Sequence, residues 1–281
     1  MQVFLNGELV EEEKALVSVF DRSFWYGDGL FETIRVHHGK PFRWLRHLER
    51  LEHGASTLGI SVPHSKEQLT SFAHQLLEAN AIPEALLRIT LSRGVGGRGY
   101  APAGAKQPTL VMTVHPLDEP GSKSRWRLHT SSVRVAARDP VAGHKSNNKL
   151  HQILAQAEAV KAGFDDALLL NTNGHMAEAA TSNFFWIQGG TIRTAPLAAG
   201  ILRGITREIV FELCDTLKLR RVETAAGPEA LPTAEGAFVT LSSMGIVEVI
   251  AVDETPIPSS DVVERIRTAY AALLEQECSA S

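Results

Sequence analysis

The sequence predicts a mixed α/β fold in two unequal lobes, and three observations lead to this class. The chain has 281 residues, 44% hydrophobic and 21% charged, so it is too long for one small core and too apolar for disorder. Strand and helix patterns alternate along it, as in an α/β (α+β) protein. The polar segment 118–124 holds both Pro and Gly, which is typical of a linker. We therefore expect a small N-terminal α/β domain over 1–117, an inter-domain linker over 118–124 and a larger C-terminal α/β domain over 125–281.

The elements of the N-terminal lobe follow from hydrophobic periodicity. The predicted strands form a hairpin over 3–10, a pair over 30–44 that turns at 38–40, and two single strands over 86–94 and 108–117. Apolar residues at helical spacing predict helices over 45–59 and 65–81.

The C-terminal lobe continues the alternation. Its predicted strands cover 126–137, 167–171, 183–187, 237–243 and 247–253. Its predicted helices cover 149–163, 205–218 and 260–276. No internal repeat or low-complexity segment interrupts this order.

Composition excludes several classes of protein. A net charge of −4 and no basic run interleaved with aromatic residues make nucleic acid an unlikely partner. No apolar run approaches the roughly 18 residues of a membrane span, so we expect no membrane contact and a cytoplasmic protein. Cys214 and Cys278 are too few for a disulfide framework. The eleven histidines show no ligand spacing, so we expect no metal site, and the absence of G-x-S-x-G removes a serine hydrolase.

The stretch from His144 to Asn183 carries the most specific chemistry. Lys145 lies among Ser and Asn residues before an amphipathic helix, where a lysine ordinarily just faces water. Glu178 lies in a run of small and apolar residues, where a carboxylate needs a partner. The pair suits pyridoxal phosphate (PLP), because a lysine amine condenses with the aldehyde and an acidic group keeps the ring nitrogen protonated.

Residues elsewhere in the chain predict a phosphate-binding site. A Gly-bounded turn before the helix at 205 leaves the amides of Ile205 and Thr206 available to an anion. Ser242 and Ser243 follow a strand, and Arg50 lies about one helical turn beyond His47. Taken singly, these residues suit a helix cap, a turn and a solvated helix face, so the hypothesis depends on their conjunction.

The glycine-rich segment 94–99 matches G-x-G-x-x-G and follows a strand. The residues after it cannot form the helix that holds a pyrophosphate, which makes a dinucleotide site improbable. The loop instead presents Arg93, Arg98 and Tyr100, a set suited to gripping a carboxylate. A solvated loop with two surface arginines is the alternative.

Seven ordered segments resemble the class IV (fold type IV) PLP enzymes, which include branched-chain aminotransferases, D-amino acid aminotransferases and 4-amino-4-deoxychorismate lyases. The segments are DRSFWYGDGLFETIRV (21–36), HLERL (47–51), SRGVGGRGY (92–100), HKSNNKLHQILAQAEA (144–159), MAEAATSNFF (176–185), GILRGITR (200–207) and LSSMGIVEV (241–249). The resemblance implies two α/β lobes with the cofactor between them, in a homodimer.

The resemblance also implies roles for single residues. Lys145 would bind the cofactor's aldehyde, Glu178 its pyridine nitrogen, and Leu202 would pack on its ring. The phosphate would be held by Arg50, Ile205, Thr206, Ser242 and Ser243.

Within the family, SRGVGGRGY and SSMGI look most like the lyases, which release pyruvate and 4-aminobenzoate for folate synthesis. Arg98 and Tyr100 would bind a carboxylate of the small amino substrate. Phe31 is a third candidate for substrate binding. The alternative for the aromatic residues at 24–31 is packing in the core. The sequence departs from the lyase pattern near Lys145, where it has KSNNKLHQ and the lyases have a sequence like K-H-L-N-R-L-E-Q. The alternative is therefore a class IV aminotransferase that acts on branched-chain L-amino acids or on D-amino acids. A non-catalytic ligand-binding relic of the fold is a remote one.

Overall fold

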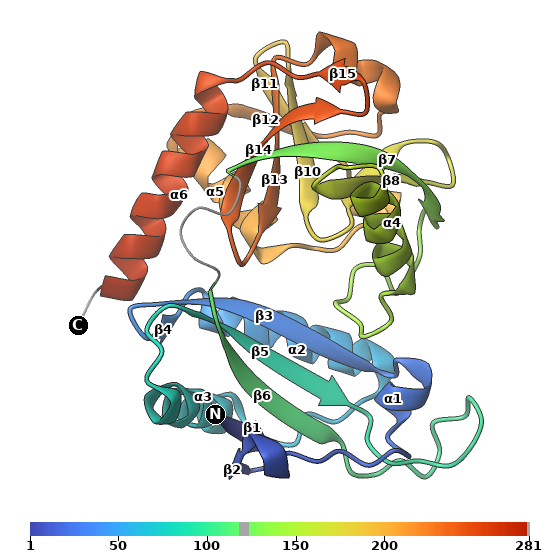
Figure 1. Cartoon of the computed structure of the whole chain (residues 1–281), viewed down its shortest axis with the longest axis vertical. Helices are drawn as coiled ribbons and strands as arrows, with labels where there is room; N and C mark the ends of the chain where they lie inside the picture. The colour runs from blue at the N-terminus through green and yellow to red at the C-terminus, as the bar shows by residue number, and fades with distance from the viewer. Residues whose placement is uncertain (118–123, 280–281) are drawn as a thin grey trace. The chain divides into compact units, whose positions relative to one another are not determined.

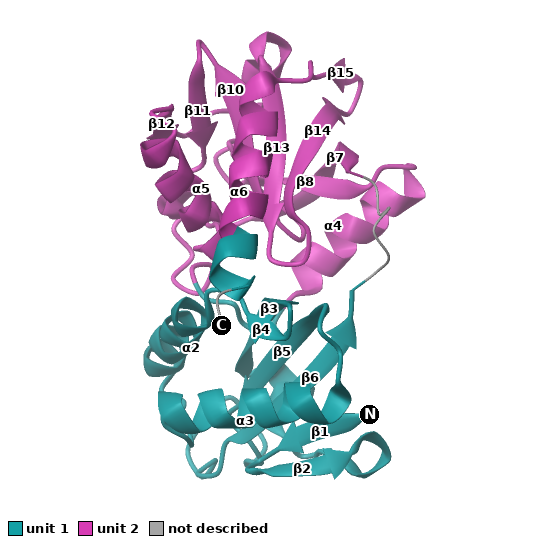
Figure 2. Ribbon diagram, turned by 90° about the vertical axis from the view of Figure 1, so that its left-hand side faces the viewer, with its two compact units in different colours: residues 1–118, 144–148, 274–281 teal, residues 119–143, 149–273 magenta. Residues whose placement is uncertain are grey.

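The computed structural model describes residues 1–117 and 124–279, which divide into two compact units (Figures 1 and 2). Unit 1 comprises residues 1–118, 144–148 and 274–281, and unit 2 comprises 119–143 and 149–273. The short segment 144–148 therefore belongs with the N-terminal part of the chain. The predicted linker lies outside the described residues except for Ser124, and the predicted domain boundaries stay a prediction.

Unit 1 is built on an antiparallel sheet with the strand order β2-β1-β6-β5-β3-β4. Its strands are β1 (Gln2–Leu5), β2 (Glu8–Glu11), β3 (Gly29–His37), β4 (Lys40–Pro41), β5 (Ala85–Ser92) and β6 (Thr109–Pro116). Its helices are the 3-10 turn η1 (Glu12–Lys14), α1 (Arg22–Tyr26), α2 (Trp44–Leu58) and α3 (Lys66–Asn80).

The two long helices of unit 1 cover one face of this sheet. Leu48 of α2 and Leu76 of α3 share a buried core with Ile34 of β3. A capping box starts α3, in which Ser65 and Gln68 each accept from the other's backbone N–H. Because side chains alternate across a strand, the even-numbered residues of β3 face the helices and the odd-numbered ones face away.

Unit 2 is built on a mixed sheet with the strand order β12-β11-β10-β13-β14-β7-β8-β9, and β15 pairs with β14. Its strands are β7 (Arg125–Val135), β8 (Asp166–Asn171), β9 (Met176–Ala179), β10 (Asn183–Gln188), β11 (Thr191–Thr194), β12 (Arg220–Glu223), β13 (Gly236–Leu241), β14 (Gly245–Val252) and β15 (Thr255–Pro256). Its helical elements are α4 (Leu150–Lys161), η2 (Leu197–Ala199), α5 (Ile205–Thr216), η3 (Pro228–Thr233) and α6 (Asp261–Ser279), whose last residues belong to unit 1.

The mixed α/β class and the long predicted elements are confirmed. The elements that the sequence did not predict are short ones: α1, β9, β11, β12, β15 and the 3-10 helices η1, η2 and η3. Each spans two to six residues, which is too few to show a hydrophobic period. Helix α6 also continues to Ser279, beyond its predicted end at Gln276.

Candidate functional site

The segment that carries Lys145 lies alongside β3. Phe31 donates its backbone N–H to the Lys145 carbonyl at 2.8 Å, and Asn147 donates to the Gly29 carbonyl at 2.9 Å. The Lys145 Nζ lies 4.5 Å from the centroid of the Phe31 ring. Lys145 is thus held by strand-like pairing outside the following helix, which begins only at Leu150.

A second cation lies against the same aromatic ring. The Arg88 guanidinium carbon is 4.1 Å from the Phe31 ring centroid, and burial lowers the pKa of Arg88. Arg88 of β5 is paired with Thr33, so it is a diagonal neighbour of Phe31. Sequence reasoning missed Arg88, because this neighbourhood depends on the register between two strands more than fifty residues apart.

The predicted phosphate ligand Arg50 is engaged by a buried carboxylate on the helix-facing side of β3. Arg50 donates from Nε to Glu32 Oε1 at 2.8 Å and from Nη2 to Oε2 at 2.6 Å, and His47 Nδ1 lies 2.7 Å from Oε2. Burial opposes ionisation of Glu32, but the charge and hydrogen bonds of Arg50, with those of His47, lower its pKa to about 2. Glu32 therefore positions Arg50, a role that the sequence did not indicate.

The pKa of His47 in the same cluster is lowered. Burial lowers the pKa of His47, the hydrogen bond to Glu32 opposes this, and the charges of Arg50 and Lys145 lower it further. The Lys145 side chain is thus electrostatically coupled to this cluster.

In unit 2, Glu178 of β9 is buried and held by neutral donors. Its Oε2 accepts from Asn183 Nδ2 at 3.1 Å and from the Leu202 backbone N–H at 2.9 Å. Asn183 Nδ2 also donates to the Leu202 carbonyl at 3.0 Å. Asn183 thereby joins the predicted ring-nitrogen ligand to the residue predicted to pack on the ring.

The start of α5 lies beside the same asparagine. Gly204 is its N-cap residue, no side chain in the described part of the chain caps the helix, and Thr206 is only 4% exposed. A Cβ at position 204 would lie 2.0 Å from Asn183 Oδ1, so a side chain there would displace Asn183. An uncapped helix start has free N–H groups and a positive dipole end, which fit an anion such as a phosphate.

The predicted serines lie in the turn between β13 and β14, which begins two residues after Thr240. Thr240 pairs directly with Asn183 in the sheet, so the two side chains share one face. The Thr240 hydroxyl is buried, and in the described part of the chain it has no hydrogen-bond partner. An orphaned hydroxyl near the helix start is a further feature that fits a bound polar group.

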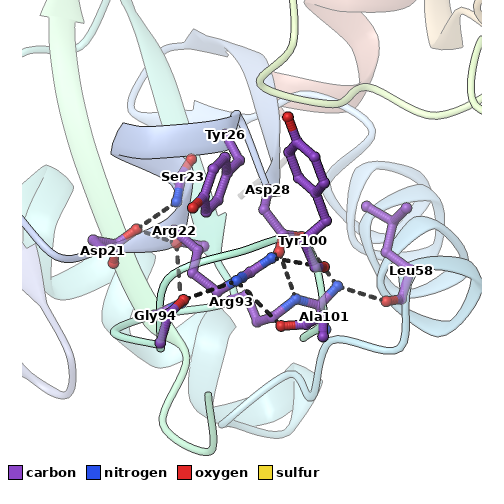
Figure 3. Close-up of polar contacts among 12 residues, drawn as sticks. Asp21, Arg22, Ser23, Tyr26, Asp28, Leu58, Arg93, Gly94, Tyr100 and Ala101 are labelled. Atoms are coloured by element: carbon purple, nitrogen blue, oxygen red, sulfur yellow. Dashed lines mark hydrogen bonds and ion pairs between the residues drawn. The ribbon is translucent and has the colours of Figure 1, made fainter. Parts of the chain in front are cut away.

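The loop that bears Arg98 and Tyr100 is held by hydrogen bonds from Arg22, which forms an ion pair with Asp28 (Figure 3). Arg22 donates from Nη1 to the carbonyl of Gly99 at 2.9 Å and from Nη2 to that of Tyr100 at 3.2 Å. Asp28 accepts from Arg22 Nε at 2.8 Å and from Arg93 Nε at 2.7 Å. Burial opposes ionisation of Asp28, but the two arginines lower its pKa.

The structure corrects the interpretation of Arg93. Its Nη1 donates to the Gly59 carbonyl at 2.9 Å and its Nη2 to the Leu58 carbonyl at 2.8 Å, at the end of α2. Arg93 is buried and is bound to Asp28 and to the end of α2, so it is neither presented to a ligand carboxylate nor a surface arginine. Arg98 is exposed and Tyr100 is 89% exposed, so both side chains are accessible to a ligand.

The structure thus gathers the predicted residues into two groups, one in each unit. Unit 1 brings Lys145 to Phe31 and adds Arg88, which the sequence did not indicate. In unit 2, Asn183 contacts both Glu178 and Leu202. A lysine amine, a buried carboxylate and an uncapped helix start are groups of the kind that PLP requires. Among the described residues, no helix is both long and apolar enough to cross a membrane.

Comparisons with known proteins point to one family. The family model for amino-transferase class IV matches residues 29–252. A putative branched-chain-amino-acid aminotransferase of Methanocaldococcus jannaschii is 35% identical, covering 94% of this chain and 92% of that protein. An aminodeoxychorismate lyase of Bacillus subtilis is 31% identical, covering 90% and 87%. The solved branched-chain amino acid aminotransferase of Escherichia coli has a TM-score of 0.92 and 26% identity, covering 97% of this chain and 94% of that one.

Proposed function

Because the chain belongs to the class IV aminotransferase family of PLP-dependent enzymes, we propose that it is a 4-amino-4-deoxychorismate lyase, releasing pyruvate and 4-aminobenzoate. The feature that carries this proposal is the SRGVGGRGY loop. Arg22 holds its backbone while Arg98 and Tyr100 stay exposed. The substrate of such a lyase carries two carboxylates, and Arg88 beside Phe31 offers a second cation for it.

We assign the cofactor contacts as follows. Lys145 binds the aldehyde covalently, Glu178 accepts a hydrogen bond from the pyridine nitrogen, and Leu202 packs on the ring. The phosphate is bound by the start of α5, through Ile205 and Thr206, and by Arg50, Ser242 and Ser243. The support is the uncapped helix start, the neutral donors to Glu178 and the Glu32 clamp on Arg50.

The reaction needs a proton to move twice. When bound, PLP supplies a protonated ring that accepts the electron pair released at the substrate carbon. The Lys145 amine, once free of the cofactor, would remove the proton from that carbon. The ring C–O bond then breaks with its electron pair on the oxygen, the Lys145 ammonium would give the proton to the departing enolpyruvate to form pyruvate, and the aromatic ring of 4-aminobenzoate remains. Arg98 and Tyr100 orient the substrate through its carboxylate.

One observation favours a second function. The relative of M. jannaschii, at 35% identity, is named a branched-chain-amino-acid aminotransferase, whereas the lyase of B. subtilis is 31% identical. In an aminotransferase, Lys145 would return the proton to the cofactor, and Arg88 or Arg98 would bind the α-carboxylate of an amino acid.

We also propose a homodimer. Aromatic residues lie exposed in and around α1, with Phe24 at 75% and Phe20 at 56%. Phe20 and Trp25 pack edge to face, and Tyr26 packs in the same way against Tyr100. Exposed apolar groups of this kind are typical of an interface. Light scattering on the eluting protein tests this, and a monomer at every concentration contradicts it.

The test of function is product analysis of the PLP-loaded protein. With aminodeoxychorismate and no keto acid, we expect pyruvate and 4-aminobenzoate in equal amounts. Conversion of an L- or D-amino acid to its keto acid, with no such release, contradicts the lyase and supports the aminotransferase. Lys145→Ala should reduce either activity by at least about 10³-fold, whereas Lys161→Ala, at an exposed lysine of α4, should not.

A further inference from the structure

Three side chains with metal-binding atoms meet in unit 1 at the hairpin between β3 and β4. They are His37, His38 and Glu275, the last from the C-terminal part of α6. One nitrogen from each ring and one carboxylate oxygen all lie within 4.8 Å of one another. We propose that this cluster binds a divalent transition-metal ion of the zinc type.

The turn explains why two successive histidines point to the same place. His38 and Gly39 form a two-residue turn with positive φ angles of 50° and 74°, as in a type I′ hairpin. Successive strand residues would face opposite sides of the sheet, but the turn removes this alternation. The two imidazole rings lie with centroids 4.1 Å apart and planes at 39°.

Both rings direct Nε2 at one carboxylate oxygen. His37 Nε2 lies 2.9 Å and His38 Nε2 3.4 Å from Glu275 Oε2. Zinc bonds of roughly 2.0 to 2.2 Å in a tetrahedron separate two ligand atoms by about 3.4 Å. Small side-chain movements therefore let all three atoms bind one ion, with water in the fourth position.

Glu84 orients the His37 ring through Nδ1, the nitrogen that does not face Glu275. Its carboxylate accepts from Arg35 Nη2 at 2.7 Å and from the His38 backbone N–H at 3.0 Å, and it lies 2.8 Å from His37 Nδ1. Because an ionised carboxylate only accepts hydrogen bonds, Glu84 keeps a proton on Nδ1. By the same rule Glu275 keeps a proton on Nε2 in the metal-free protein, and in the proposed site the metal ion replaces that proton. Metal-binding histidines have this arrangement, with a carboxylate on the distal ring nitrogen.

The facing groups need a cation between them. A bare Nε2 lone pair and a carboxylate oxygen repel each other at 2.9 Å. One proton bridges a single histidine to Glu275, whereas one metal ion binds both histidines and the carboxylate. The side chains of His38 and Glu275 are 51% and 56% exposed, so an ion and its water can enter from solvent. Imidazole and carboxylate ligands suit zinc, cobalt or nickel.

This site is separate from the lysine site and was hidden from sequence reasoning. His37 is six residues beyond Phe31 on β3, which places it about 20 Å along the strand. The expectation of no metal site came from ligand spacing, and Glu275 lies 238 residues from His37.

The test uses tag-free, PLP-loaded full-length protein titrated with Zn²⁺ against a chromophoric chelator. We expect one ion per chain, bound at least about 10-fold more weakly by Glu275→Gln and by His38→Asn. Asparagine tolerates the positive φ of position 38, so this second variant should stay folded. The control His74→Asn, at an exposed histidine of α3, should bind as the wild type does.

Substitution with Co²⁺ gives an independent readout. The proposal predicts an absorption band of the bound ion that is lost in Glu275→Gln, while the absorbance of the cofactor is unchanged in every variant. The proposal is wrong if the wild type retains no ion, or if the Glu275 and His38 variants bind as tightly as the His74 control. The cluster would then be a set of ion pairs only. Neither result bears on the proposed lyase activity.

Discussion

Two buried carboxylates, one in each unit, accept hydrogen bonds from different kinds of donor. Glu32 in unit 1 is 1% exposed and lies against the cation Arg50, with two hydrogen bonds at 2.8 and 2.6 Å. Glu178 in unit 2 is 9% exposed and accepts from two neutral groups, the Asn183 amide and the Leu202 backbone N–H. A neutral donor orients a carboxylate through a hydrogen bond, whereas an arginine fork also supplies the opposite charge.

The proposed roles of the two carboxylates differ. Glu32 positions Arg50 and Arg50 supplies the opposite charge, so removing Glu32 leaves a poorly solvated cation behind. In its proposed role, Glu178 would face the protonated pyridine nitrogen of PLP. The first carboxylate should therefore matter mainly for stability and the second mainly for turnover.

The largest effect is expected for Glu32→Gln. Removing one partner of a buried ion pair should lower the free energy of unfolding by about 3 to 5 kcal/mol. Chemical denaturation of the variant and the wild type measures this. Glu49→Gln, at an exposed glutamate of α2, is the control and should change little. A change below about 1 kcal/mol would mean that the pair with Arg50 adds nothing to folding.

The next effect is expected for Glu178→Gln. The substitution keeps the shape and the acceptor oxygen but removes the charge, so kcat should fall by about 10²- to 10³-fold. PLP should stay bound, as its absorbance after gel filtration will report, and the melting temperature should shift little. Glu254→Gln, at an exposed glutamate of unit 2, is the matched control. Full activity in Glu178→Gln would exclude the assigned role.

The pH dependence of the free energy of unfolding should test the ion pair of Glu32 with Arg50. Burial opposes ionisation of Glu32, yet Arg50 lowers its pKa from 4.5 to about 2. The stabilisation from this lowered pKa is fully present above pH 4.5 and is lost as the pH falls toward 2. It amounts to about 3 kcal/mol. Between pH 4.5 and pH 2, the free energy of unfolding should fall more steeply with falling pH for the wild type than for Glu32→Gln. Parallel plots of this free energy against pH would contradict the ion pair of Glu32 with Arg50.

The smallest effect is expected for Asn183→Ala. The change removes one donor to Glu178 and one to the Leu202 carbonyl, which should cost about 1 to 2 kcal/mol of stability. Thermal unfolding measures this, with Asn173→Ala at an exposed turn as the control. If the asparagine also holds Glu178 in place, kcat should fall by less than it does in Glu178→Gln. A loss of kcat as large as in Glu178→Gln would show that position matters as much as charge.

Most of the regular structure could be predicted, because long helices and strands repeat their hydrophobic pattern. Helix α2 was expected over 45–59 and runs from Trp44 to Leu58, and α3 was expected over 65–81 and runs from Lys66 to Asn80. Strand β11, of four residues, was not predicted, because it is too short to show a period and is defined by its pairing with neighbours.

The sequence by itself determined the chemical character of this protein. Lys145 before a helix, Glu178 in an apolar run and the uncapped start of α5 are local features of the chain. Together with seven ordered motifs they were enough to indicate a PLP enzyme, and the family match bears this out.

Tertiary structure alone decided which side chains meet. Arg88 reaches Phe31 through the register of two strands, and Glu275 reaches His37 across 238 residues of chain. Arg93 was expected either at a ligand or at the surface, yet it binds Asp28 and the end of α2. The physical reason is that side-chain partnerships depend on distances in space. Local propensity and periodicity carry information over only a few residues.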